Sequence, residues 1–426
     1  MIRENEYKQR RDCLLNKLSN NSIAIVFSAT NKTRSNDTQY PYRQDSSLYY
    51  LTGFKEDNSA LVLIKYKNKT KSILFVQKKD KNLELWTGKR LGIKKAKQKF
   101  KIDEIYESEN LKSKLKEFLK DKKSLYCDLN SGHKKIKKVL QYAKSIENHK
   151  NISLLVGQMR LIKSENEIKL IKKAIGITAN AHHYAMSSKK IGKKEYELQA
   201  EIEYIFKRSG AFSDAYTSII ACGNSANTLH YINNNKILVN NELILIDAGC
   251  EYDYYASDIT RTIPVNGKFS EAQAEIYQLV LDTQIEIIKN IKPGVNRTKL
   301  QSLAELLLTR GMVKLGILHG SVKKLIKNNV HKKYYPHGIG HWMGIDVHDQ
   351  APYLDNKEKE IPLASGMVLT IEPGLYINKD DKRVPKKYRG IGIRIEDDIL
   401  VTKYGNKNLS SAIVKRINEI EKLSQV

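Results

Sequence analysis

Residues 243–262, LILIDAGCEYDYYASDITRT, place two acids in segments whose other residues predict strands. Asp247 ends an apolar run, and Asp258 follows eleven residues later. A hairpin that turns at Tyr252-Asp253 would set the two carboxylates opposite each other. Like charges facing each other across a ladder destabilise it, and burial adds to that cost. A divalent cation between them would reverse the effect, so the stretch predicts a metal site. The alternative is a different register in which both acids face solvent.

Histidines gather in the C-terminal third of the chain, where five of the ten fall within thirty residues: His319, His331, His337, His341 and His348. Three of these lie in the run PHGIGHWMGIDVHD, residues 336–349. Its glycines, Gly338, Gly340 and Gly344, make a regular helix unfavourable and permit close backbone packing. The run therefore predicts a loop at a site rather than a helical pair of zinc ligands.

Two glutamates interrupt strand-like segments further on. Glu372 lies in MVLTIEPGLYI (367–377), and Glu396 lies in GIGIRIEDDILV (390–401), where it shares one strand face with Arg394. Buried charges must be paired or ligated. A structural Arg394–Glu396 pair is possible, but it leaves Glu372 unexplained.

The combined donor set contains two aspartates, at least one histidine and two glutamates. Such an oxygen-rich set suits a pair of Mn²⁺-, Co²⁺- or Zn²⁺-like ions that share carboxylates. The four cysteines are scattered and form no CxxC pair, which argues against a thiolate zinc site and against a disulfide framework.

The pattern of elements divides the chain into two domains, 1–155 and 156–426. In the first, strand-like runs at 22–29, 59–66 and 71–77 and a helix at 112–121 predict an α/β domain. In the second, Ser164 with Glu167 and Ser270 with Gln273 form capping boxes that start helices, and a third helix spans about 195–208. Strand-like runs at 236–247, 367–377 and 390–402 between and after these helices predict an α+β domain.

The composition of the chain predicts its compartment and argues against some classes of partner. No apolar stretch approaches the roughly 20 residues of a membrane span, and the N-terminus lacks the apolar core of a signal peptide, so we expect a cytoplasmic protein without membrane association. The net charge of +27 could attract nucleic acid. The lysines, however, accompany no RNA- or DNA-binding motif, which favours a solvated basic surface and no specific nucleic-acid partner.

Four segments of the second half closely resemble the Xaa-Pro aminopeptidase (aminopeptidase P) family of the creatinase/methionine aminopeptidase, or pita-bread, superfamily. They are DAGCEYDYYASDITRTIPVNGKFS, HGIGHWMGIDVHD, TIEPGLYI and YRGIGIRIEDDILVT. In the first half, SNDTQYPYRQDSSLYYLTGF (35–54) is similar to the N-terminal domain of that family. The resemblance covers nearly the whole chain. It implies a creatinase-like α/β N-terminal domain followed by an α+β pita-bread catalytic domain.

The resemblance also implies a set of metal ligands at matching positions: Asp247, Asp258, His341, Glu372 and Glu396. Asp258 and Glu396 would bridge two divalent ions in each subunit, and Mn²⁺ is the usual metal of the family. All five positions carry the expected residue type, so nothing in the sequence suggests an inactive descendant.

The implied reaction is hydrolysis of the bond between an N-terminal residue and a following proline by a hydroxide that bridges the two ions. Glu372 would accept and relay the proton, and His348 would donate to the carbonyl or developing oxyanion. His230 resembles a family histidine that lines the substrate pocket. His337 and Arg394 would orient ligands and offset excess negative charge. Family members commonly form homo-dimers or homo-tetramers through the N-terminal domain.

Four other functions compete with this one. A prolidase shares fold and metals but cleaves only Xaa-Pro dipeptides. Methionine aminopeptidase has no use for the N-terminal domain, and the metal-free chemistry of creatinase does not require all five ligands. A silent pita-bread module that binds protein or nucleic acid through its basic surface would be expected to have lost at least one ligand. The sequence leaves open the preferred first residue, the native metal and the subunit count.

Overall fold

A computed structural model describes residues 2–425. The chain forms two compact units, one that extends to Met159 and one that starts at Arg160. The sequence pattern placed this division at 155/156. Among the described residues, no helix is both long and apolar enough to cross a membrane.

A six-stranded mixed sheet, in the order β6-β5-β4-β1-β7-β8, forms the centre of the smaller unit. Its strands are β1 (Ser22–Phe27), β4 (Ala60–Lys65), β5 (Thr70–Val76), β6 (Glu104–Glu107), β7 (Ser124–Cys127) and β8 (Asn148–Asn151), beside a small ribbon of β2 (Thr33–Ser35) and β3 (Thr38–Gln39). Its helices are α1 (Glu4–Lys17), α2 (Ser46–Thr52), α3 (Lys81–Thr87), α4 (Gly92–Lys99), α5 (Leu111–Leu119), α6 (Lys134–Tyr142) and α7 (Ile152–Arg160). The three strands and the helix expected from the sequence are all present.

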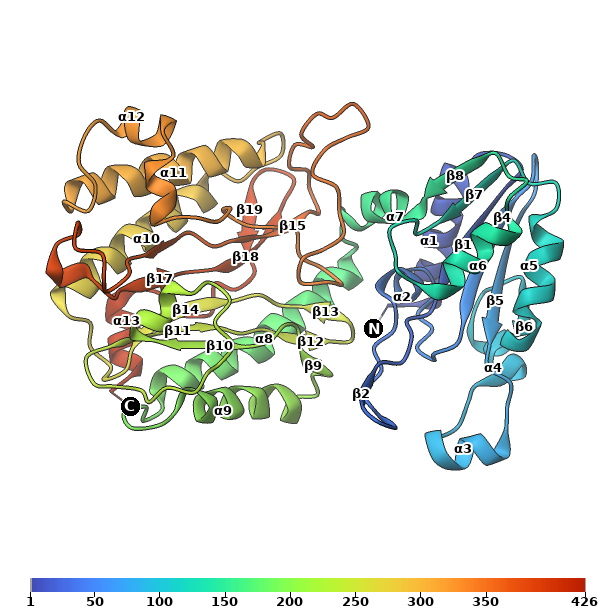
Figure 1. Cartoon of the computed structure of the whole chain (residues 1–426), viewed down its shortest axis with the longest axis horizontal. Coiled ribbons are helices and arrows are strands. Elements are labelled where there is room, and N and C mark those ends of the chain that lie inside the picture. The colour runs from blue at the N-terminus through green and yellow to red at the C-terminus, as the bar shows by residue number, and fades with distance from the viewer. Residues whose placement is uncertain (1, 426) are drawn as a thin grey trace. The chain divides into compact units, whose positions relative to one another are not determined.

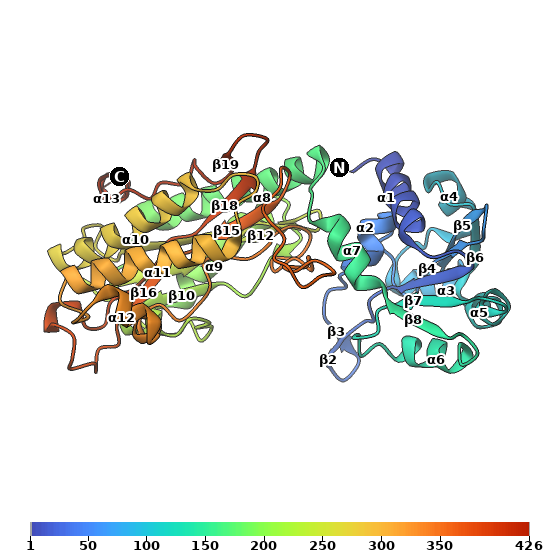
Figure 2. The same cartoon turned by 90° about the horizontal axis from the view of Figure 1, so that it is seen from above.

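Helices cover both faces of this sheet, with α1 and α4 on one side and α5 and α6 on the other (Figure 2). The alternation of side chains along each strand explains why two faces need cover. Ile73 and Phe75 pack toward α5 and α6, whereas Leu74 and Val76 pack toward α4. The smaller unit is therefore the α/β domain that its sequence predicted.

The larger unit combines four small antiparallel sheets with long helices. Its helices are α8 (Glu165–Ser187), α9 (Glu195–Arg208), α10 (Glu271–Lys289), α11 (Arg297–Lys314), α12 (Val322–Lys327) and α13 (Ile417–Leu423). Its strands are β9 (Ser213–Asp214), β10 (Ile219–Cys222), β11 (Leu243–Asp247), β12 (Cys250–Tyr252), β13 (Tyr255–Ala256), β14 (Thr260–Pro264), β15 (Val368–Ile371), β16 (Gly374–Tyr376), β17 (Gly392–Arg394), β18 (Asp397–Val401) and β19 (Asn406–Asn408).

The strands of this unit lie between α8 and α9 on one side and α10 and α11 on the other (Figure 1). Both predicted capping boxes are confirmed: Ser164 caps α8 with Glu167, and Ser270 caps α10 with Gln273. One strand prediction was too long. Residues 236–242 do not continue β11; their start instead pairs with the segment before α9, where Ile237 bridges Lys194.

The hairpin that carries the two aspartates has a different register from the one expected. Asp247 pairs with Thr260, not with Asp258, and the turn lies at Asp253-Tyr254. Both turn residues have positive φ, 46° and 75°, as the tight turns that match strand twist require. Asp258 is thus a diagonal neighbour of Asp247, still close enough to share a ligand but not directly opposite it.

The two glutamates lie on a second, longer hairpin whose ladder is interrupted in the middle. β15 pairs with β18, where Ile371 lies opposite Asp397, and β16 pairs with β17, where Gly374 lies opposite Arg394. Each strand has two residues between the ladders, and Ile395 N donates to the carbonyl of Pro373 there. The same register therefore continues through the gap and sets Glu372 opposite Glu396. Two acids face each other at the one place where the ladder opens.

A buried histidine fastens α8 to the strand end that carries Asp247. His182 lies 3.0 Å from the carbonyl of Ala248 through Nε2, and its Nδ1 has no hydrogen-bond partner among residues 2–425. Burial lowers the pKa of His182 from 6.5 to about 3. The folded protein therefore holds this ring neutral over a pH range in which the unfolded chain protonates it.

We expect acid to weaken the fold through His182. Because the pKa is lower in the folded state, its contribution is intact above pH 6.5 and is lost as pH falls from 6.5 toward 3. Between pH 7.5 and pH 5 this amounts to about 2 kcal/mol. Urea unfolding of wild type and His182→Asn at both pH values measures it: the pH dependence should shrink in the variant, and an equal dependence in both proteins would contradict the prediction.

Candidate metal centre

A cavity of about 410 Å³ opens in the larger unit, and all nine residues predicted for the site line it: His230, Asp247, Asp258, His337, His341, His348, Glu372, Arg394 and Glu396. They come from strand ends and loops that are far apart in the chain. The fold therefore brings every one of the predicted residues to a single concave surface.

Three of these side chains form the centre of the cluster. One ligand atom from each of Asp258, His341 and Glu396 lies within 4.8 Å of the other two, and both acids are buried. Thr260 donates to Glu396 Oε2 at 2.7 Å, which fixes one oxygen of that carboxylate. Burial, followed by the charges of Asp258, Glu372 and Asp247, raises the pKa of Glu396 well above its usual value.

His341 is oriented as a metal ligand must be. Its Nδ1 lies 3.1 Å from the carbonyl of Trp342, which can only accept, so Nδ1 carries the proton and Nε2 faces the acids. Nε2 is 3.2 Å from Asp258 Oδ2 and 3.8 Å from Glu372 Oε1. Burial alone would lower the pKa of His341, but the hydrogen bond and charge of Asp258 outweigh it and raise the pKa to about 9.

Glycine at 340 lets the histidine loop lie against β15. A Cβ on Gly340 would come within 1.9 Å of the carbonyl oxygen of Thr370, so no other residue fits without moving the strand. The close approach allows Thr370 N to donate to the carbonyl of His341 at 2.9 Å, and His341 N to donate to Thr370 Oγ1 at 3.1 Å. The close packing expected at Gly340 is confirmed, whereas a Cβ on Gly338 would meet Arg297 Nη2 at 3.9 Å, an ordinary contact.

The two remaining acids occupy the rim of the cluster. Burial raises the pKa of Glu372 to about 7, with the negative charges of Asp258 and Asp247 adding to the shift. Arg394 donates to Asp247 Oδ2 at 2.6 Å, yet Asp247 Oδ1 is buried and finds no hydrogen-bond partner in the described part of the chain. The site thus holds more negative charge than Arg394 and His341 can offset.

Arg394 also connects the cluster to His337 through Tyr376. Arg394 Nη1 donates to Tyr376 Oη at 2.9 Å, and Tyr376 Oη lies 2.8 Å from His337 Nε2. His337 Nδ1 faces the carbonyl of Gly338 at 2.8 Å and so carries the proton of the neutral ring. Burial and the charge of Arg394 lower the pKa of His337 to about 4, which keeps the ring neutral.

Two of the histidines that line the cavity, His230 and His348, are exposed. The ring of His348 packs edge-on against His341, with 4.1 Å between ring centroids. The other two histidines of the predicted group lie elsewhere: His331 is buried beside Glu305, 3.6 Å away, and His319 is exposed.

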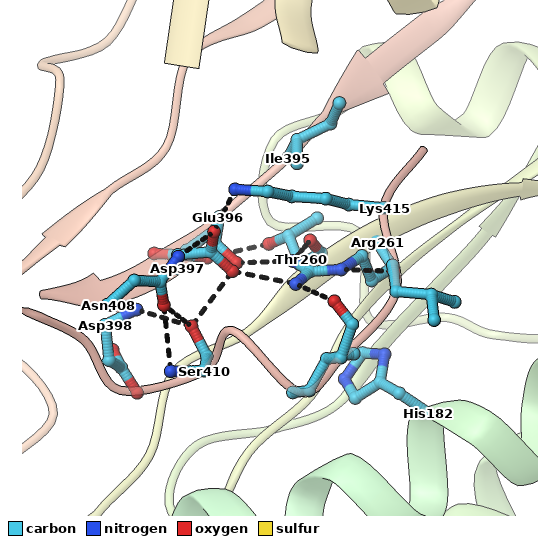
Figure 3. A network of polar contacts seen from close by, with 12 residues as sticks. His182, Thr260, Arg261, Ile395, Glu396, Asp397, Asp398, Asn408, Ser410 and Lys415 are labelled. Carbon is cyan, nitrogen blue, oxygen red and sulfur yellow. Dashed lines mark hydrogen bonds and ion pairs between the residues drawn. The ribbon is translucent and has the colours of Figure 1, made fainter. Parts of the chain in front are cut away.

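A buried polar network supports the cluster from behind (Figure 3). Arg261 is fully buried, and its guanidinium donates to the carbonyls of Thr260 and Glu396 at 2.9 and 2.7 Å. It also pairs with Asp397 at 2.7 Å and donates to two carbonyls of the C-terminal segment 413–414. One side chain thus joins β14, the segment containing Glu396 and the end of the chain.

Sequence reasoning missed part of the cavity wall, which also includes Tyr216, Thr217, Ile219, Leu229, Ile232 and Val347. Burial, together with the charges of Asp247 and Asp258, raises the pKa of Tyr216 well above 10. Tyr216 and its apolar neighbours carry no spacing or composition that would set them apart in the sequence. Tyr376 is not among the lining residues and packs in an apolar cluster with Ile219 and Leu229.

Comparisons with known proteins agree with this geometry. The model of metallopeptidase family M24 matches residues 169–403, and the model of the aminopeptidase P N-terminal domain matches residues 7–126. The chain is 41% identical to the Xaa-Pro aminopeptidases of Haemophilus influenzae and Escherichia coli, over 98% and 99% of its length and 96% and 98% of theirs. Human Xaa-Pro aminopeptidase 3 is 36% identical over 98% of this chain and 85% of its own.

Solved structures show the same relationship. E. coli aminopeptidase P with the inhibitor Pro-Leu superposes with a TM-score of 0.95 at 39% identity, covering 100% of this chain and 98% of the other. A zinc-substituted form of the same enzyme, in complex with product, gives the same values. The fold is therefore an aminopeptidase P-type N-terminal domain joined to a catalytic domain of the pita-bread type. The chain belongs to metallopeptidase family M24.

Proposed function

We propose that this protein is a metal-dependent Xaa-Pro aminopeptidase, which hydrolyses the bond between an N-terminal residue and a following proline. The observation that carries the proposal is the convergence of Asp258, His341 and Glu396 within 4.8 Å in one cavity, with Asp247 and Glu372 on its wall. The full-length relatives at 41% identity bear the name Xaa-Pro aminopeptidase, which supports the same reaction here.

The residues present fit a pair of divalent cations. His341 Nε2 faces three acids, Asp258, Glu372 and Glu396. Glu372 and Glu396 lie opposite each other in their hairpin, and Asp247 Oδ1 lacks a hydrogen-bond partner within residues 2–425. Cations would remove each of these costs. We propose two Mn²⁺ ions per subunit, held by Asp247, Asp258, His341, Glu372 and Glu396. When bound, they supply Lewis acidity that acidifies water and polarises a carbonyl.

Glu372 is the side chain placed to move the proton. It lies at the cavity wall between His341, 3.8 Å from one oxygen, and His337, 3.8 Å from the other. A carboxylate there can take a proton from the attacking water and deliver it to the imide nitrogen that leaves. The downstream part of the peptide then lies on the side of His337.

The exposed histidines are placed to hold the scissile amide. His348 projects into the cavity beside His341 and can donate to the peptide carbonyl or to the oxyanion that develops on it. His230 lines the same cavity and can contact the substrate backbone. Asp247, held by Arg394 at 2.6 Å, offers a carboxylate to the free N-terminal amine, which would restrict cleavage to the first bond.

Proline at the second position suits such a site for a chemical reason. An Xaa-Pro imide has no N–H, so a peptidase that relies on that donor loses the contact. A cavity whose wall includes Ile219, Leu229 and Val347 can instead contact the pyrrolidine ring through apolar atoms.

The nearest alternative is a prolidase, and substrate length separates the two. We expect Mn²⁺-reconstituted protein to hydrolyse Xaa-Pro-Yaa tripeptides with kcat/KM at least about tenfold above that for the matching Xaa-Pro dipeptides. Liquid chromatography of both reactions, run side by side, measures this ratio. Cleavage of dipeptides alone would identify a prolidase, and cleavage of neither would refute the proposed function.

We also propose a homo-oligomer in which α3 contributes to the interface. Trp86 and Leu85 on this short helix are both 83% exposed, an unusual state for large apolar side chains. We propose that Trp86 also reaches the active site of a neighbouring subunit. Replacing Trp86 with alanine should therefore lower the oligomeric mass in light scattering and raise KM. An unchanged mass together with an unchanged KM would exclude a role for Trp86.

A further inference from the structure

Two buried cations, Arg160 at the end of α7 and Lys163 between α7 and α8, converge on one aspartate of the histidine loop. Arg160 Nη2 pairs with Asp349 Oδ1, and Lys163 Nζ donates to Asp349 Oδ2 at 3.1 Å. All three side chains are 1% exposed. Gly344 makes room for them, because a Cβ there would lie 2.8 Å from Asp349 Oδ2 and 2.9 Å from Lys163 Cε.

The same guanidinium holds the loop at a second point. Arg160 Nη2 is 2.5 Å from Asp346 Oδ2, so its two acidic partners bracket Val347 and His348. Main-chain bonds close the loop around them: Asp349 N donates to the carbonyl of Trp342 at 2.8 Å, and Gly344 N donates to that of Asp346 at 3.0 Å. His348 therefore lies on a short bridge with a charged anchor at each end.

Stability alone does not explain such an arrangement. Removing charges from water carries a large desolvation cost, and well-packed apolar residues are often as stabilising as a buried ion pair. Buried ion pairs differ from apolar contacts in being directional, since they hold a carboxylate at a defined distance and angle. Burial would raise the pKa of Asp349, but Arg160 and Lys163 outweigh it and lower the pKa, so the anchor stays ionised.

We propose that Arg160, Lys163 and Asp349 are positioning residues that hold His348 against the reacting carbonyl. The inference rests on the proposed function, in which His348 contacts the substrate. Arg160 and Lys163 act only through the loop: they lie outside the residues that line the cavity, and Asp349 turns away from it into the buried cluster.

A double-mutant cycle tests the proposal. Asp349→Asn keeps the shape of the side chain and removes its charge, and we expect kcat for an Xaa-Pro-Yaa peptide to fall about 10- to 30-fold with KM changed less than threefold. His348→Ala should lower kcat about 100-fold. If Asp349 acts through His348, the double variant should be no slower than His348→Ala. Arg160→Lys should retain more activity than Arg160→Met.

Asp381→Asn is the matched control, because Asp381 is also buried and is paired with Lys333, but away from the cavity. In the double variant of Asp381 and His348, the factors by which the two substitutions lower kcat should multiply. If the kcat losses of Asp349→Asn and His348→Ala multiply in the same way, the proposal is wrong.

Hydrogen exchange of residues 341–351 gives a readout that needs no activity. Exchange should rise in Asp349→Asn, and unchanged exchange would also overturn the proposal. Failure of wild type to cleave any Xaa-Pro peptide, with exchange still raised in the variant, would instead refute the proposed function.

Discussion

Alanine at Asp258 or at Glu396 is expected to lower kcat/KM for an Xaa-Pro-Yaa peptide at least about a thousandfold, which corresponds to about 4 kcal/mol of transition-state stabilisation. Each of these carboxylates lies in the central group with His341, so its loss leaves too few oxygens for two cations. Metal analysis after gel filtration should find less than one Mn²⁺ per chain in either variant.

In the absence of metal, Glu396→Ala should not destabilise the protein, although it abolishes activity in the metal-loaded enzyme. Glu396 is buried opposite Glu372, and both burial and the neighbouring acids disfavour its ionised form. Metal-free Glu396→Ala should therefore unfold at a temperature no lower than metal-free wild type. Added Mn²⁺ should raise the unfolding temperature of wild type by several degrees and leave that of the variant unchanged.

Asp380→Ala is the control for both measurements, because Asp380 is an exposed acid of the same unit. It should leave activity and metal content within about 20% of wild type, as expected for a surface position remote from the site. An Asp258→Ala or Glu396→Ala protein that keeps full activity after chelation and gel filtration would refute the metal-dependent reaction.

Replacing Arg261 with methionine is expected to cost about 4 kcal/mol or more in the free energy of unfolding, the range found when one partner of a buried ion pair is removed. The substitution removes one of the two cations that pair with the ionised Asp397, leaving Lys415, and removes donors from the carbonyls of Thr260 and Glu396 (Figure 3). Because those carbonyls belong to segments that carry Asp258 and Glu396, the affinity for Mn²⁺ should fall as well. Guanidinium unfolding and calorimetric titration measure the two effects.

Arg383→Met provides the comparison, since Arg383 pairs with Asp381 but is 77% exposed. It should cost no more than about 1 kcal/mol. Arg261→Lys keeps the charge with fewer donors and should fall between wild type and Arg261→Met, which preserves a measurement if the methionine variant does not fold. A loss within about 1 kcal/mol for Arg261→Met would show that the network does not hold these segments together.

Elements defined by neighbouring residues could be predicted from the sequence. The starts of α8 and α10 follow from capping boxes that span four residues, and both are found where the pattern placed them. The close approach at Gly340 could be anticipated for the same reason, because a missing side chain is visible in the sequence itself. The four acids stood out because each lies in a strand-like segment, whereas the choice of His341 among the clustered histidines came from resemblance to a family.

Strand register could not be predicted, because it depends on which turn closes the hairpin. A turn at Tyr252-Asp253 and one at Asp253-Tyr254 are equally short, and only the structure shows that Asp253 and Tyr254 both adopt positive φ. The shift moved the partner of Asp247 from Asp258 to Thr260. The sequence likewise does not show that Glu372 lies opposite Glu396, because that placement depends on two separate ladders that share one register.

Long-range ion pairs were missed for a different reason. Asp349 meets Arg160 across 189 positions and Arg261 meets Asp397 across 136, so no local pattern connects them. Each of these residues resembles an ordinary charged surface residue in the sequence. Asp349 gains its partners because residues 160–163 pack against the histidine loop. Arg261 gains its partners because three chain segments pack around its guanidinium.

The shared register of the glutamate hairpin also determines where the protein tolerates added length. The ladders fix Glu372 against Glu396 from both sides, and Ile377 still pairs with Ile391 at the far end, so the tip formed by residues 378–389 takes no part in aligning the two acids. Extra residues between the exposed Lys379 and Asp380 would therefore leave the two glutamates opposite each other. A single residue inserted between Ile371 and Gly374 would instead turn one carboxylate to the opposite face of the ribbon.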